Sequence, residues 1–309
     1  GQNGLSWERW SHILALAERL GFPSVFRSDH YFIGSHKDSL DAYLSFVLAA
    51  RETRTIRFGP LVSPVTFRSP VDVGRMATQV DVLSGGRFVM GLGAGWNEAE
   101  HRGYGIPFPP VRERFDRLEE SIKLIQALWS PGRASYQGKF YGIEDVECLP
   151  KSASGGPPIL IGGNGEKRTL RLVAQYASEW NGVNLSPEAY AHKKEMLEQH
   201  CEAVGRDPAT ISRSMMTFGL VGPTQDAVDQ ATRYFMEMSS TRQSSSLEEF
   251  RDQARERGMI IGQTEEVVER LGQLAKLGVE DVQFEHLDYS SDEGPEYLAS
   301  EIMPRVASF

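Results

Sequence analysis

Residues 56–96 read IRFGPLVSPVTFRSPVDVGRMATQVDVLSGGRFVMGLGAGW, and this stretch carries the clearest pattern of strands and helices in the chain. The apolar runs Ile56–Val62 and Arg87–Leu92 predict two buried strands. Between them, apolar residues recur at the spacing of one helix face: Val73, Met76, Val80 and Leu83. A strand, a helix and a second strand with no hairpin between them predict a parallel βαβ unit.

The same alternation continues on both sides of this unit. Further strands are predicted at Ser24–Arg27, Pro158–Ile161, Glu179–Val183, Ile211–Val221 and Asp281–Glu285. Helices are predicted at Trp7–Leu20, Ser39–Arg51, Arg112–Trp129, Glu166–Ala177, Pro187–Val204, Thr224–Met238, Gly262–Leu277 and Pro295–Val306. Asn97–Val111 is expected to be a long loop, and Ser130–Gly156 an irregular insertion with a hairpin or lid.

Seven predicted strands, each followed by a helix, are one short of the eight that close a (β/α)8 TIM barrel. No strand precedes the first helix, so we expect the first strand to lie upstream of residue 1. A doubly wound open sheet is the competing fold, but it normally shows one dominant phosphate loop. Functional-looking residues here follow four different strands, which favours a single barrel domain over residues 1–309.

Composition limits the classes of function. The chain has 309 residues, a formal net charge of −9 and 40% apolar residues, which suits one large soluble domain. The acidic balance argues against a nucleic-acid partner, and no apolar run approaches the roughly 20 residues of a membrane span. Without a signal peptide, and with two cysteines, Cys148 and Cys201, outside any CxxC motif, the chain is expected to be cytoplasmic.

Asp29 and His30 follow the strand Ser24–Arg27, at the end where barrels carry their active sites. An imidazole can take or give a proton near neutral pH, and the adjacent carboxylate could bond a cofactor ring. Two solvated polar residues in a loop are an equally good interpretation from spacing alone.

Two glycine-rich turns are candidates for ligand contact. Gly91–Gly95 resembles a dinucleotide loop only weakly, although its bare backbone would admit a flat ring or a phosphate. Gly162-Gly163-Asn164-Gly165 opens a helix and is followed by Lys167 and Arg168, which favours a phosphate site over a plain turn. Glu98, Glu100 and His101 lack the spacing of a metal site, so no metal is expected.

Taken together and in order, five segments resemble the bacterial luciferase-like superfamily, and most of all its branch of oxidoreductases that use the deazaflavin coenzyme F420. The segments are SVFRSDHYF, RFGPLVSPVTFRSP, DVLSGGRFVMGLGAGWNEAEH, PPILIGGNGEKRTLRLVAQYASEWN and GQTEEVVERL. The resemblance covers nearly the whole chain. It implies a (β/α)8 barrel with the coenzyme ring in its mouth.

The resemblance also implies roles for single residues. Asp29 and His30 match the pair in which the histidine acts as acid or base near the reacting ring carbon. Leu61, Val62 and Ser63 match a bulge with a non-proline cis peptide, placed at Leu61–Val62; a cis bond at Ser63–Pro64 is the alternative that base rates favour. The remaining matches are to ring, ribityl and phosphate contacts: Ala94, Gly95, Gly162, Gly163, Asn164, Gly165, Trp180 and Asn181.

The sequence departs from the sugar-phosphate dehydrogenases of this family at two places. Those enzymes have a tryptophan four residues after the histidine, where this chain has Gly34, and an acid after the fourth-strand loop, where it has Trp96-Asn97. Glu98 could supply that acid. A sugar phosphate is therefore not the expected substrate, and the substrate itself cannot be read from the sequence.

The sequence thus predicts an F420-dependent oxidoreductase that moves a hydride between a small organic substrate and the deazaflavin C5, with His30 handling the proton and Lys167 or Arg168 the phosphate. The alternatives are a luciferase-like monooxygenase that uses reduced FMN and a non-catalytic luciferase-like barrel. The resemblance also implies a homodimer formed through helices Ser39–Arg51 and Val71–Leu83. Ser130–Gly156 and Ser239–Met259 are expected to line the substrate pocket.

Overall fold

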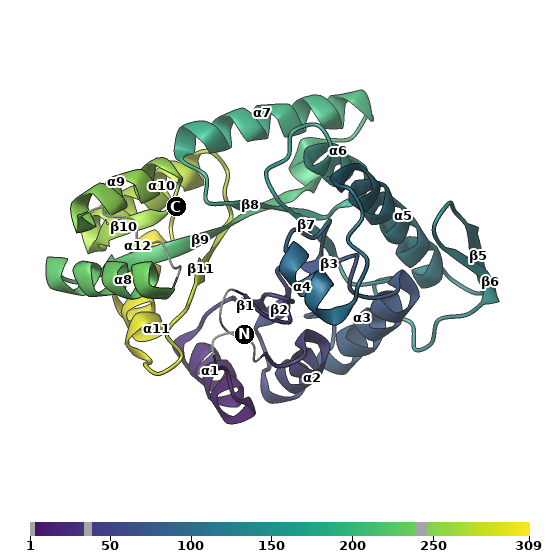
Figure 1. Ribbon diagram of the computed structural model, residues 1–309, viewed down its shortest axis with the longest axis horizontal. Helices are drawn as coiled ribbons and strands as arrows, with labels where there is room; N and C mark the ends of the chain where they lie inside the picture. The colour runs from purple at the N-terminus through teal and green to yellow at the C-terminus, as the bar shows by residue number, and fades with distance from the viewer. Residues whose placement is uncertain (1–3, 34–38, 239–245) are drawn as a thin grey trace. The chain divides into compact units, whose positions relative to one another are not determined.

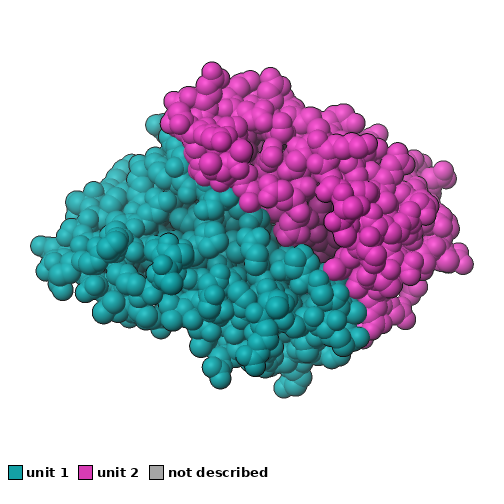
Figure 2. Space-filling model, turned by 180° about the vertical axis from the view of Figure 1, so that it is seen from behind, with its two compact units in different colours: residues 1–162, 175–179 teal, residues 163–174, 180–309 magenta. Residues whose placement is uncertain are grey.

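The computed structural model describes residues 4–33, 39–238 and 246–309 (Figure 1). Gly34 and part of the segment 239–259 fall outside these ranges, so the expectations that rest on them are not addressed by the structure. The chain divides into two compact units (Figure 2): residues 1–162 with 175–179, and residues 163–174 with 180–309. The interpretation of residues 1–309 as a single domain stays a prediction.

The first unit begins with two parallel strands joined by a helix. Helix α1, Trp7–Leu20, leads to strand β1, Ser24–Arg27; helix α2, Ala42–Glu52, then leads to strand β2, Arg57–Pro60. Ser24 pairs with Arg57 and Arg27 with Pro60, so the two strands run in the same direction. The residues after both strands therefore emerge at the same edge, and Asp29 and His30 lie there.

The βαβ unit predicted from residues 56–96 is present. Strand β3, Ser63–Pro64, helix α3, Pro70–Ser84, and strand β4, Met90–Gly93, follow β2. The β3–β4 pair and the pair of β4 with strand β7, Ile159–Gly162, are both parallel, and a bridge between Phe58 and Phe88 links β2 to the start of the β4 segment.

The predicted strand Ile56–Val62 is interrupted by a bulge. Strand β2 ends at Pro60 and β3 begins at Ser63, just beyond the predicted strand, and the peptide Leu61–Val62 between them is cis. The cis peptide is thus where the family resemblance put it. The alternative at Ser63–Pro64 is wrong, because that bond is not among the cis peptides of the described chain.

The bulge also explains the first glycine motif. A Cβ on Gly91 would stand 2.0 Å from the Pro60 carbonyl oxygen, and one on Gly93 would stand 2.6 Å from Val62 Cγ2. A Cβ on Gly162 would come within 2.9 Å of Val62 Cγ1. These glycines are needed first of all to let β4 and β7 lie against the bulge.

Two segments predicted as irregular contain regular structure. The expected loop Asn97–Val111 carries helix α4, Glu98–Tyr104, before helix α5, Val111–Trp129. The insertion 130–156 contains an antiparallel hairpin of β5, Ala134–Gln137, and β6, Gly142–Val146, as one of the two expected forms. The buried Glu120 on α5 anchors this hairpin by accepting the backbone N–H groups of its turn: Lys139, Phe140 and Tyr141.

The second unit continues the alternation of strands and helices. Its elements in order are α6 (Thr169–Tyr176), β8 (Glu179–Val183), α7 (Pro187–Ala203), β9 (Ser212–Gly222), α8 (Gln225–Met238), α9 (Leu247–Glu256), β10 (Ile260–Gln263), α10 (Thr264–Lys276), β11 (Asp281–Glu285), α11 (Glu293–Tyr297) and α12 (Met303–Val306). The last residues of α6 and the first of β8 are counted with the first unit.

Strand β9 is the centre of the second unit's sheet. It neighbours β8, and it pairs in parallel with β11 along its first half and with β10 along its second half. Strand β10 was not predicted, because Ile260–Gln263 is short and runs into the helix α10. Across the described ranges, no helix combines the length and the apolar character needed to cross a membrane.

Candidate active site

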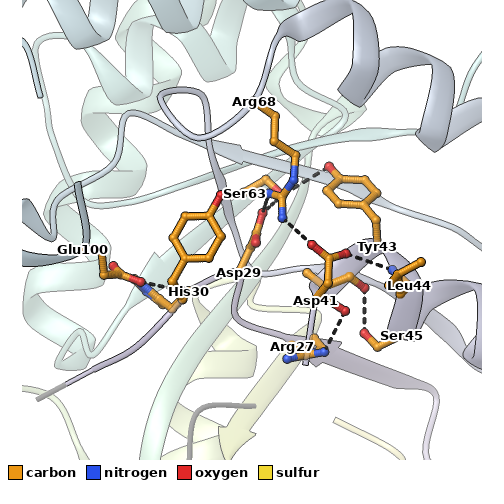
Figure 3. A network of polar contacts seen from close by, with 12 residues as sticks. Arg27, Asp29, His30, Asp41, Tyr43, Leu44, Ser45, Ser63, Arg68 and Glu100 are labelled. Carbon is orange, nitrogen blue, oxygen red and sulfur yellow. Dashed lines mark hydrogen bonds and ion pairs between the residues drawn. The ribbon is translucent and has the colours of Figure 1, made fainter. Parts of the chain in front are cut away.

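His30 and Glu100 form the central contact of the first unit's site (Figure 3). His30 Nδ1 lies 2.7 Å from Glu100 Oε2, and the carboxylate is fully buried while the imidazole is 11% exposed. The other oxygen, Glu100 Oε1, accepts the backbone N–H groups of Tyr31 at 2.6 Å and Phe32 at 3.1 Å. One carboxylate from α4 therefore holds both the imidazole and the backbone after it.

Aromatic side chains surround this pair. The Trp96 ring stands edge-on to His30, with 5.4 Å between the ring centroids, and it is 65% exposed. Tyr31 lies between Phe67 and Tyr104, each with a centroid 4.6 Å away. Burial raises the pKa of Tyr31, which keeps its hydroxyl protonated at neutral pH. The imidazole therefore has one aromatic neighbour, Trp96, and the backbone after it leads into an aromatic cluster.

A second network connects Asp29 to the bulge. Asp29 Oδ2 accepts hydrogen bonds from Ser63 Oγ at 2.7 Å and from Arg68 Nη1 at 2.6 Å. Arg68 Nη2 donates to Asp41 Oδ2 at 2.9 Å, so the guanidinium lies between two carboxylates in Figure 3. Burial alone would lower the pKa of Arg68, but the two carboxylates outweigh it and raise that pKa.

Tyr43 completes the contacts of Ser63. Its hydroxyl lies 3.2 Å from Ser63 Oγ, and burial raises the pKa of Tyr43 far above its usual range. The pKa of Asp41 is lowered: burial opposes ionisation, but the Leu44 N–H and the Arg68 guanidinium outweigh it. Asp29, Ser63 and Arg68 thus form one hydrogen-bonded group. Ser63 is the residue that directly follows the cis peptide, so this group holds the backbone there.

A small pocket opens beside these two networks. It is lined by residues of the connection between β1 and α2, by the first residue of α2, by the segment after β3 and by the end of α4: Asp29, His30, Tyr31, Ser39, Leu40, Asp41, Ala42, Arg68 and Tyr104. Arg27 donates to the carbonyl oxygens of Leu40 and Asp41 and so fixes one wall. The structure therefore brings the predicted pair Asp29 and His30 to a concave surface.

Glu98, the acid proposed from the sequence, does not contact His30. It starts helix α4 with an exposed side chain. Its charge acts on Arg114, where it opposes the burial that lowers the pKa of that guanidinium. Glu100, two residues later, makes the contact instead, because two residues on a helix turn the side chain to the opposite face. Sequence reasoning had considered Glu100 only as a metal ligand.

His101 has a structural environment. Its Nδ1 lies 2.7 Å from the Asn97 carbonyl oxygen and its Nε2 2.7 Å from Thr66 Oγ1, and the ring packs against Phe67 and Phe108. With both ring nitrogens engaged, this histidine joins α4 to the loop after β3. Ala94 and Gly95 lie in the loop between β4 and α4. Gly95 has a φ of 80°, which favours glycine at this position.

Gly162, the first residue of the predicted phosphate turn, ends β7 in the first unit, and the rest of the turn is tightly held within the second unit. The Gly163 N–H donates to the Asn181 carbonyl at 2.9 Å, and Trp180 Nε1 donates to the Gly163 carbonyl at 3.0 Å. The Asn164 side chain bonds both the N–H and the C=O of Val183. Trp180 is fully buried, so its role here is to fix the turn.

Three other residues predicted for the cofactor have distinct surroundings. Asn181 is buried and donates through Nδ2 to Ser214 Oγ and Gln283 Oε1. Lys167 is exposed and Arg168 half-buried beside the turn. The predicted contacts of all these residues with a cofactor stay predictions.

Comparison with known proteins places these features in a family. The model of the luciferase-like monooxygenase family matches residues 2–281. An F420-dependent glucose-6-phosphate dehydrogenase from Microbacterium testaceum is 28% identical over 94% of this chain and 91% of its own.

Solved structures with the same fold cover almost the whole chain. The F420-dependent tetrahydromethanopterin reductase from Methanopyrus kandleri matches with a TM-score of 0.82 and 19% identity, over 98% of this chain and 97% of its own. A monooxygenase from Streptomyces bottropensis matches with a TM-score of 0.81 and 19% identity, over 96% and 92%. The (β/α)8 barrel predicted from the sequence is confirmed as the fold class by this likeness.

Proposed function

This chain belongs to the luciferase-like monooxygenase family, and from that premise we propose that it is an oxidoreductase that uses coenzyme F420. We propose further that a hydride passes between a small organic substrate and C5 of the deazaflavin. The observation that carries the proposal is the imidazole of His30, held by Glu100 at the rim of the first unit's strands beside a concave surface.

The residues present suit a flat redox ring. Ala94 and Gly95 follow β4 with almost no side chain, and the bulge at Leu61–Val62 lies against Gly93 at the end of β4, next to Ser63, which Asp29 holds. The coenzyme, when bound, supplies the hydride chemistry. The chain's own contributions are to fix the ring's surroundings through the Asp29–Ser63–Arg68 unit and to take or give the substrate proton at His30.

Titration with the two candidate coenzymes tests the proposal. We expect F420 to bind and to lose fluorescence on binding, with FMN binding much more weakly. A His30→Ala variant should bind F420 as the wild type does and lose about 10²- to 10⁴-fold in turnover, the usual contribution of acid–base catalysis. Normal turnover in a variant with normal F420 binding would remove His30 from the mechanism.

A monooxygenase that uses reduced FMN is the second candidate, since a monooxygenase structure matches almost as well as a reductase. Tight FMN binding with oxygen consumption in the presence of reduced FMN would favour it. Binding of neither coenzyme would favour the non-catalytic barrel.

We also propose a homodimer. Helices α2 and α3 pack against each other in the first unit and carry large apolar side chains that are exposed: Leu44 at 62%, Val47 at 44%, Val82 at 45% and Leu83 at 41%. Exposed apolar side chains on neighbouring helices are typical of a surface covered by a partner. A second copy of this chain is the partner that we propose.

A further inference from the structure

The carboxylate of Glu100 is shared between an ionisable side chain and the backbone. Its Oε2 faces His30 Nδ1, and its Oε1 accepts two backbone N–H groups. It is 0% exposed, so no water competes for these oxygens at its surface. A carboxylate in this position determines which atom carries the proton of the hydrogen bond between Glu100 and His30.

An ionised carboxylate has only acceptor positions. The proton of the His30–Glu100 hydrogen bond must then reside on Nδ1 of the imidazole. A neutral imidazole carries one ring proton, so Nε2 is left with its lone pair. Among the described residues, none makes a hydrogen bond to Nε2.

We propose that Glu100 is the positioning residue of His30: it fixes the imidazole in the Nδ1–H tautomer and leaves Nε2 as the atom that exchanges a proton with the substrate. This inference rests on the proposed role of His30 and adds the atom and the residue that selects it. The Trp96 ring, edge-on at 5.4 Å, limits rotation of the imidazole from the side.

The isosteric Glu100→Gln variant tests the proposal, because glutamine has one acceptor oxygen where glutamate has two, and this difference determines which tautomer His30 adopts. A glutamine has one carbonyl oxygen, and the two backbone donors of Tyr31 and Phe32 compete for it with the single donor of His30. We expect the oxygen to remain with the backbone and the NH₂ group to face Nδ1. Since NH₂ is a donor, the imidazole must then present its lone pair at Nδ1 and carry its proton on Nε2.

The measurement is the ¹⁵N spectrum of the histidine rings in the protein without coenzyme, recorded at about pH 9, above the ordinary imidazole titration range. A His30→Gln variant identifies the His30 signals among those of the seven histidines. We expect Nδ1–H in the wild type and Nε2–H in Glu100→Gln. Turnover with F420 should fall about tenfold or more in Glu100→Gln while the Kd for F420 stays within about twofold.

Glu120 offers a matched control. It is also a buried glutamate on a helix, and its oxygens accept three backbone N–H groups without any histidine. Glu120→Gln should lose thermal stability in the same way as Glu100→Gln, but it should keep the wild-type His30 tautomer and turnover. A change of tautomer confined to Glu100→Gln therefore separates positioning from a purely structural loss.

Two results would overturn the inference. One is a wild-type His30 that carries its proton on Nε2, which can be read even if the variant does not fold. The other is a folded Glu100→Gln protein whose His30 tautomer is unchanged. Because both readouts use the protein without coenzyme, they are separate from the proposed function, which fails instead if F420 does not bind.

Discussion

At the scale of single residues, the ionisable side chains of the site pair with one another within the first unit. Asp29 is 3% exposed and Arg68 is its cationic partner, while Asp41 takes the other arm of the same guanidinium. A buried ion pair contributes little against an apolar alternative, but loss of one partner leaves the other charge buried without compensation. The guanidinium of Arg68 is thus a structural requirement of this site.

Replacement of Arg68 by methionine should therefore destabilise the protein by about 3–5 kcal/mol, the usual cost of removing one partner of a buried pair. Urea unfolding measures this cost. The double variant Arg68→Met/Asp29→Asn should recover part of it, because the isolated charge is gone. Arg305→Met, which breaks an exposed pair with Glu265, is the control and should change stability little. A loss in Arg68→Met no larger than in Arg305→Met would contradict the prediction.

Asp81 on α3 gives a pH-dependent prediction. Burial raises its pKa, although the Ser152 hydroxyl donates to it and opposes the shift. The folded protein therefore holds this proton to higher pH than the unfolded chain, whose Asp residues ionise near pH 4. Stability from this group is present at low pH and is lost as the pH rises through the raised value.

An Asp81→Asn variant cannot ionise and should not lose stability over that window. We expect its Tm, relative to the wild type, to increase as the pH rises above the ordinary aspartate value of about 4. Asp252→Asn, at an exposed aspartate, is the control and should show no such trend. A constant difference in Tm between Asp81→Asn and wild type across the range would refute the assignment.

At the scale of elements, the bulge between β2 and β3 determines what its neighbours can be. The Val62 side chain and the Pro60 carbonyl occupy the space where Gly91 and Gly93 would carry a Cβ. The glycine motif after residue 90 is therefore explained by packing of strands before any ligand is considered. This explanation also accounts for its weak match to a dinucleotide loop.

A Gly91→Ala substitution should then be severe, because the nearest atom is a backbone oxygen that cannot move aside. We expect a loss of about 3 kcal/mol or more, measured by thermal or urea unfolding. Gly142→Ala in the hairpin is the control, since its closest neighbour is the end of the Gln137 side chain at 3.0 Å. Equal and small losses in the two variants would show that the strands do not lie this close.

At the scale of the whole molecule, the open question is assembly. The exposed apolar residues of α2 and α3 all lie on the first unit. The net charge of −9 opposes unspecific association of single copies, but it does not remove these apolar side chains from water. We expect the double variant Leu44→Glu/Val47→Glu to be monomeric and folded, while the wild type is dimeric. Light scattering at micromolar concentration checks both masses. A monomeric wild type would reject the dimer.

The sequence by itself predicted most of the order of strands and helices and the barrel class, and it put Asp29 and His30 after a strand, because hydrophobic periodicity and short motifs are local properties. It also placed the cis peptide at Leu61–Val62 through the family resemblance. It did not find strand β10 or helix α4, which are too short for a periodic pattern to separate them from their surroundings.

Only the tertiary structure decided that Glu100, and not Glu98, faces His30. Both are acids in the same helix, 70 and 68 positions along the chain from the histidine, and the side of α4 that turns inward selects between them. The same holds for Arg68, which follows β3, while its two carboxylates, Asp29 and Asp41, lie at the two ends of the connection between β1 and α2. Contacts between distant segments depend on packing, and that information is not carried by any local pattern.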